Sequence, residues 1–92
     1  MPRSVSSSVQ TADASVTTRE SKVYGVLVGA GATGGAWQLN DSSDDSGTDL
    51  ISGIVQANGG YFVNLSEIPV QFSTGIRADL EGSNITITVF YD

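Results

Sequence analysis

The chain contains no cysteine and no histidine. These absences exclude disulfide bonds, thiolate zinc sites and imidazole ligands, and they remove two of the commonest catalytic side chains. Lys22 is the only lysine, and no serine has a neighbouring base to activate it. A carboxylate pair such as Glu67 with Asp79 remains. Asp79, however, alternates with apolar residues, which is typical of a solvated charge or an ion-pair partner. The sequence therefore predicts no enzyme and no catalytic, cofactor or metal site.

Long apolar runs are also missing. No stretch could span a bilayer, and the start Met1-Pro2-Arg3-Ser4 lacks the apolar segment of a secretory signal. At 92 residues the chain is one domain with a thin core. Small domains supplement such cores with disulfides, metals or oligomerisation. Because the first is excluded and His or Cys metal sites are too, we expect self-association.

Positive charge is scarce, with four bases against ten acids and a net charge of −6. Residues 1–12 carry only Arg3 and a charge of +1, whereas residues 13–92 hold all the acids and a charge of −7. An acidic body repels phosphate groups. We therefore expect neither nucleic acid nor a membrane as a partner.

Residues 1–12 differ in composition from the rest of the chain. They are rich in serine and hold little to bury beyond Val5 and Val9. Such a segment cannot repay its ordering entropy alone. The prediction is a flexible N-terminal arm followed by a domain over 13–92. As alternatives, the arm is a disordered tail, or it docks on a partner through Arg3, Val5 and Val9.

From about residue 15 onward the pattern is β. Ile76, Ala78 and Leu80 alternate with charged residues, and the segment 85–91 alternates in the same way, which is typical of half-buried strands. The segment 23–28 is apolar on both faces, as in a central strand. Further short strands are predicted near 16–18, 37–40, 50–57 (with a candidate bulge at Gly53), 61–65 and 70–73. About eight short antiparallel strands indicate a β-sandwich of jelly-roll type.

Residues 29–34 match the dinucleotide-binding pattern G-x-G-x-x-G after an apolar strand. That site needs a helix after the glycines, because the helix N-terminus holds the pyrophosphate. Here a short alternating strand, 37–40, follows instead. We therefore interpret the glycines as a hairpin loop.

Four acids, Asp41, Asp44, Asp45 and Asp49, crowd a second loop. Their spacing does not match an EF-hand, although clustered carboxylates can hold calcium. The favoured interpretation is a solvated acidic turn.

Tyr61 and Phe62 are adjacent in a predicted strand, so they point to opposite faces. One of them is expected outside the core, where an exposed aromatic is a candidate contact for a partner or a second copy.

Two blocks carry a resemblance to a known family. The first runs from Pro69 to Tyr91 and includes Gly75-Ile76-Arg77-Ala78-Asp79-Leu80; the second joins Lys22–Val28 to Gly35–Asp41 through the glycine loop, as a hairpin. Together they resemble small β-sandwich virion proteins of tailed phages, including cyanophages. The resemblance implies a jelly-roll-like fold and a structural role, often as a trimer on the capsid exterior.

The expected function is therefore that of a capsid decoration (cement) protein that bridges shell subunits. Its expected partners are the major capsid protein and its own copies, as a homotrimer. It would be made in the host cytoplasm and carried on the capsid exterior. The alternatives are a tail-associated or host-surface glycan-binding module and a cellular binding domain unrelated to viruses.

Overall fold

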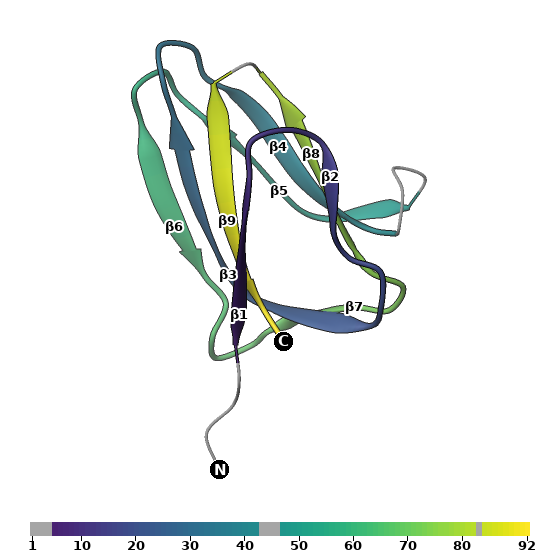
Figure 1. The fold of residues 1–92 in the computed structure, drawn as a ribbon. Helices are drawn as coiled ribbons and strands as arrows, with labels where there is room; N and C mark the ends of the chain where they lie inside the picture. Colours follow the sequence, from purple (N-terminus) through teal and green to yellow (C-terminus); the bar gives the residue numbers. More distant parts are fainter. Residues whose placement is uncertain (1–4, 43–46, 83) are drawn as a thin grey trace.

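The computed structural model describes residues 5–42, 47–82 and 84–92, which form strands in two antiparallel sheets (Figure 1). Sheet A has the order β1-β9-β3-β6, with β7 also paired to β3, and sheet B has the order β2-β8-β4-β5. The strands of these described residues are β1 (Ser6–Gln10), β2 (Ala14–Thr17), β3 (Ser21–Ala30), β4 (Gly35–Asp41), β5 (Thr48–Val55), β6 (Gly60–Asn64), β7 (Val70–Phe72), β8 (Ile76–Glu81) and β9 (Ile85–Tyr91).

The pairing of the strands is that of a jelly roll. With the short β7 set aside, the first strand pairs with the last, the second with the last but one, and so on inward: β1–β9, β2–β8, β3–β6 and β4–β5. Successive strands mostly alternate between the sheets, so the two layers close around one interior. The predicted all-β sandwich is confirmed.

The core forms where the inward faces of the two sheets meet. Sheet A contributes the valines of β3 and the alternate apolar residues of β9, and sheet B contributes Trp37, Leu39, Ile76 and Ala78. Thr86 and Thr88, between the buried residues of β9, point outward. The period-two pattern of the sequence therefore assigned these faces correctly.

The N-terminal segment differs from its prediction. Of the predicted arm, residues 6–10 belong to the domain, because β1 pairs with β9 along its whole length, from Ser6 opposite Tyr91 to Gln10 opposite Ile87; residues 1–4 lie outside the described residues. Just after β1, the carboxylate of Asp13 accepts a bond from the amide of Leu80 at 2.7 Å. An edge strand is held mainly by backbone hydrogen bonds to its neighbour, so the serine-rich β1 does not need apolar side chains to pair with β9.

Two local predictions were also wrong. The glycine loop does not join a hairpin, because β3 lies in sheet A and β4 in sheet B. The bulge of β5 is not at Gly53, which lies regularly opposite Trp37; the register shifts instead around Leu50. The first error concerns which strands are neighbours and the second concerns the register of a pair, and local periodicity reports neither.

Candidate functional site

An uncharged row of side chains crosses the whole outer face of sheet A. Val9 lies opposite Thr88, Thr88 opposite Leu27, and Leu27 opposite Phe62, so the row spans β1, β9, β3 and β6. Directly opposite residues point to the same face of a sheet. The exposed fractions are 62% for Val9, 49% for Leu27 and 51% for Phe62. We call Val9, Leu27, Phe62, Thr88 and Phe90 the outer row.

Phe62 also contacts the neighbouring strands. Its ring packs edge-to-face on Phe90, with the centroids 6.1 Å apart and an interplanar angle of 76°. It can reach Phe90 because Gly25, opposite Phe90, has no side chain: a Cβ there would lie 2.7 Å from Phe62 Cζ. This edge-to-face geometry is favourable for aromatic pairs. The glycine therefore fixes the position of an exposed ring.

A shallow hollow of about 310 Å³ lies beside the outer row. It is lined by Leu27, Val28, Gly29, Thr86 and Thr88. Gly29 lies opposite Gly60, and a Cβ added at Gly29 would meet no atom within 4 Å. This pair of glycines leaves the sheet surface bare next to Leu27, where an apolar side chain of a partner could be accommodated.

The outer face of sheet B is polar over β4 and β8, whereas its edge strand β5 exposes Leu50 and Ile54. The Asn40 side-chain amide donates to the Asp79 carboxylate, and Arg77 Nε lies 3.5 Å from Asp79 Oδ1. Gln38 Nε2 donates to Glu81 Oε2 at 3.0 Å. These contacts pair most of the polar groups with one another, although the buried Oδ1 of Asn40 has no hydrogen-bond partner among the described residues.

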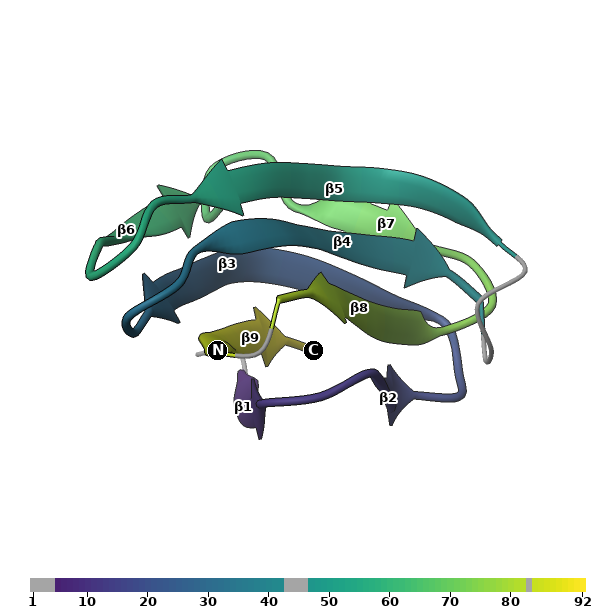
Figure 2. The same ribbon diagram turned by 90° about the horizontal axis from the view of Figure 1, so that it is seen from above.

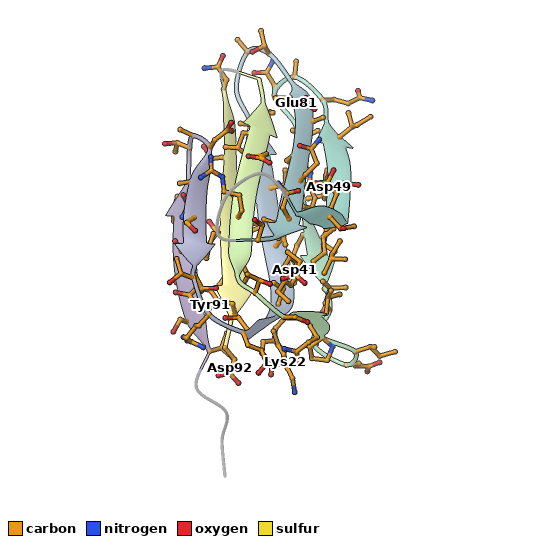
Figure 3. All side chains as sticks on the ribbon, turned by 90° about the vertical axis from the view of Figure 1, so that its right-hand side faces the viewer. Lys22, Asp41, Asp49, Glu81, Tyr91 and Asp92 are labelled. Atoms are coloured by element: carbon orange, nitrogen blue, oxygen red, sulfur yellow. The ribbon has the colours of Figure 1, made fainter. Side chains whose placement is uncertain are left out.

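Charge follows the same division between the faces. Asp41, Asp49 and Glu81 lie along the sheet B side of the molecule (Figure 3), where Asp79 also lies. The outer row carries no charged residue. The acidic residues of sheet B and the uncharged, partly aromatic outer row thus lie on opposite sides of the sandwich.

Tyr61 and Phe62, the predicted contact residues, have different roles. The Tyr61 ring is partly exposed, but its hydroxyl accepts a bond from Trp37 Nε1 at 2.7 Å and donates to the Ile54 carbonyl at 2.9 Å. Phe62 points outward, as adjacency in a strand requires. Tyr61 therefore serves the interior, and Phe62 belongs to the outer row.

The predicted docking residues of the N-terminal segment do not form one group. Arg3 lies outside the described residues. Val5 and Val9 are both exposed, and Val9 takes its place in the outer row through β1. The sequence missed Leu27 as a site residue, although the run 23–28 has apolar residues on both faces; of Phe90 and Tyr91, one was expected to point away from the core, and the structure places Phe90 in the outer row.

The glycine loop is explained by packing. β4 begins at Gly35, so a strand follows the glycines, as predicted, where a nucleotide site needs a helix. Cβ atoms at Gly34 and Gly35 would lie 2.2 Å from the Val55 carbonyl oxygen and 2.1 Å from the Glu81 carbonyl oxygen, respectively. Only glycine allows this approach of the backbones.

In the acidic loop, Asp41 serves a structural role. Its carboxylate accepts a bond from the amide of Thr74 at 2.8 Å. This bond is the main reason that the pKa of Asp41 lies below its ordinary value of 3.8; burial opposes the lowering, and the amides of Ser73 and Gly75 add to it. Asp44 and Asp45 lie outside the described residues. Among the rest, no three acidic side chains are grouped as metal ligands.

The candidate carboxylate pair is not assembled by the fold. Asp79 lies in β8 of sheet B and is partnered by Arg77, whereas Glu67 lies in the connection between β6 and β7 of sheet A.

Within the described ranges, no helix is long and apolar enough to cross a membrane.

Comparisons of the chain with family models, curated proteins and solved structures give no match. The site that stands out physically is therefore the outer row of sheet A and the hollow beside it.

Proposed function

We propose that this protein is a structural component of a phage-type virion: a capsid decoration protein that docks the outer face of sheet A on the major capsid protein and so bridges shell subunits. The observation that carries the proposal is the outer row, in which half-exposed apolar side chains cross four strands. Fully buried, each contributes on the order of 1.5–3 kcal/mol relative to exposure.

The kind of surface favours a protein as the partner. Uncharged surfaces with aromatic residues are typical of the centres of protein–protein interfaces. Phe62 is held in place by Phe90 before binding, so little conformational entropy remains to be lost there. The bare backbone at Gly29 adds a hollow beside the row that an anchoring side chain of the shell would fill.

The fold adds support of a weaker kind. Jelly rolls occur in viral capsid proteins, and also in lectins and cupins, so the fold alone does not select a function. The resemblance of the segment 69–91 to virion proteins favours a capsid role over that of a lectin or a cupin.

Glycan binding on a host surface receives less support. A sugar-binding site needs an exposed aromatic face beside planar polar groups. Trp37 is buried in the core, and the Tyr61 hydroxyl is already engaged by Trp37 and Ile54. The outer row offers apolar groups and two of the chain's phenylalanines but no charged group for hydrogen bonds.

The first test of the proposal is genomic and the second is biochemical. A major capsid gene should lie near the gene of this chain, and shells assembled from that capsid protein should co-sediment with the purified protein. Leu27→Thr keeps a strand-forming residue but removes apolar contact, and we expect it to weaken attachment about tenfold. Gly29→Val places a side chain in the hollow, where its Cβ would meet no atom within 4 Å, and we expect a loss of similar size.

The matched control is Ile68→Thr, which removes an equally apolar side chain, 81% exposed, from the connection between β6 and β7. It should attach as the parent does. Attachment that is insensitive to Leu27→Thr and Gly29→Val, or a genome with no capsid gene, contradicts the proposal.

A further inference from the structure

The strand β5 has an open edge. It is the last strand of sheet B, and among the described residues it pairs with β4 alone, so no described strand lies beside the N–H and C=O groups along its other side (Figure 2). Natural edge strands are usually shortened or protected by Lys or Pro against pairing with another chain. β5 has eight residues, and its sequence Thr-Asp-Leu-Ile-Ser-Gly-Ile-Val contains neither; its one irregularity is the bulge at Leu50, and residues 51–55 pair regularly with β4.

The apolar residues of this edge are arranged symmetrically. Leu50 is 42% exposed and Ile54 is 74% exposed, and Ser52 lies midway between them. If two antiparallel β5 strands pair with Ser52 opposite Ser52, the Leu50 of each copy lies opposite the Ile54 of the other. Two apolar cross-strand pairs then form on one face, related by a two-fold axis.

The charges and existing hydrogen bonds allow this register. The only charged residue of β5, Asp49, lies opposite Val55 of the other copy, so no two carboxylates are directly opposed. The carbonyl of Ile54 already accepts the Tyr61 hydroxyl at 2.9 Å, but a carbonyl oxygen has two lone pairs and can accept a second bond. The small core of a chain without disulfides adds a reason for self-association.

We infer that a second copy of this chain docks on β5, edge to edge and antiparallel, and that the two four-stranded B sheets join into one continuous sheet. The contact is self-complementary only for an identical strand, which is why the occupant is a copy rather than another protein. This edge-to-edge contact uses the same surface on both copies, so it gives a dimer. The homotrimer expected from the sequence would instead need two different contact surfaces on each copy.

A cysteine placed at the two-fold axis tests the register directly, because the native chain has no cysteine to interfere. In Ser52→Cys the two thiols of a dimer face each other across directly opposite positions, at a separation that a disulfide can bridge. Under mild oxidation we expect a covalent dimer in high yield. The matched controls are Ser15→Cys on β2, the other edge of the same sheet, and Ile54→Cys, which in this register lies four residues along the strand from its counterpart in the other copy.

The strength of the association is measured separately by sedimentation at about 0.15 M salt, where repulsion between acidic copies is screened. Ile54→Ser should weaken the dimer about a hundredfold or more, because the change occurs twice in each dimer, while Ile68→Ser should leave it unchanged. The inference is supported if the parent sediments as a dimer, the Ile54→Ser variant dissociates to a monomer, and the Ser52→Cys variant cross-links. A monomer at micromolar concentration, a trimer, or cross-linking at Ser15→Cys or Ile54→Cys in preference to Ser52→Cys overturns it.

Discussion

Trp37 in the core donates its indole N–H to the hydroxyl of Tyr61 across the gap between the two sheets, with Nε1 and Oη 2.7 Å apart. Trp37 belongs to β4 of sheet B and Tyr61 to β6 of sheet A. The Tyr61 hydroxyl in turn donates to the Ile54 carbonyl of β5. A single phenol thus satisfies a buried donor and ties three strands together, which accounts for why an aromatic at the rim of the sandwich is tyrosine.

Removing the Tyr61 hydroxyl should lower the stability of the fold. Tyr61→Phe leaves the Trp37 N–H without its acceptor while the ring still fills its place, so we expect a loss of about 1–3 kcal/mol in the free energy of unfolding. Urea unfolding followed by Trp37 fluorescence measures it. Tyr91→Phe, at the end of β9, serves as the control for losing a phenol, and an equal loss in both variants would refute the special role of the Trp37–Tyr61 bond.

Gly53 should tolerate no side chain, whereas Gly29 should. A Cβ at Gly53 would lie 2.7 Å from Tyr61 Oη and 2.9 Å from Trp37 Nε1, but one at Gly29 meets nothing within 4 Å. We expect Gly53→Ala to destabilise the fold by about 1–3 kcal/mol, as overpacking does. Gly29→Ala should be neutral or stabilise by about 0.4–1 kcal/mol, because the unfolded chain loses freedom. Thermal unfolding of both variants measures the difference. Similar melting temperatures for Gly53→Ala and Gly29→Ala would contradict the close contacts at Gly53.

The bond from Thr74 to Asp41 should appear in the pH dependence of stability. The pKa of Asp41 is lowered in the folded state, mainly by the Thr74 amide, so the folded protein favours the ionised carboxylate. The resulting stabilisation is complete above the unfolded pKa and is lost as the pH falls through the lower, folded pKa. We therefore expect Asp41→Asn to be less stable than the parent at pH 7 and the difference to shrink below about pH 3.8.

Unfolding in urea at a series of pH values measures this difference. Glu67→Gln, in the connection between β6 and β7, removes a carboxylate of the same charge and should show no comparable closing of the gap. A stability difference for Asp41→Asn that stays constant down to pH 2 would exclude the charge on Asp41 as its cause.

Truncation of the N-terminal segment should affect folding. Deleting residues 1–12 removes β1 and uncovers the edge of β9, so we expect a lower melting temperature and aggregation through the exposed edge. Deleting residues 1–4 leaves β1 intact and should leave the melting temperature near that of the parent. A full deletion that is as stable and as soluble as the parent would restore the interpretation of 1–12 as an arm.

Much of the fold could be predicted from the sequence, because the signals lie in neighbouring residues of one strand. Alternation in 76–81 and 85–91 reports which side chains share a face, because successive residues of a strand point to opposite sides. The turn between β5 and β6 also has a local cause: Asn58 has a φ of 58°, a conformation that asparagine tolerates better than most residues. Strand positions and the sandwich class follow from signals of this kind.

The site was only half predictable. One of Tyr61 and Phe62 was expected outside the core, but the local pattern did not say which, and nothing in it paired Phe62 with Phe90, 28 positions further along the chain. β1 was missed because a serine-rich strand has no apolar alternation to reveal it, and its place depends on the backbone of β9.

By itself, the sequence determined what each short segment is: the period-two strands, the faces of those strands, the acidic body and the lack of thiol and imidazole chemistry. The tertiary structure alone decided which strands lie side by side, and with that the outer row of sheet A, the bond from Trp37 to Tyr61 and the open edge of β5. The physical reason is that alternation is set by the geometry of neighbouring residues along one chain. Strand pairing depends on hydrogen bonds and contacts between segments far apart in the sequence, whose partners no local pattern names.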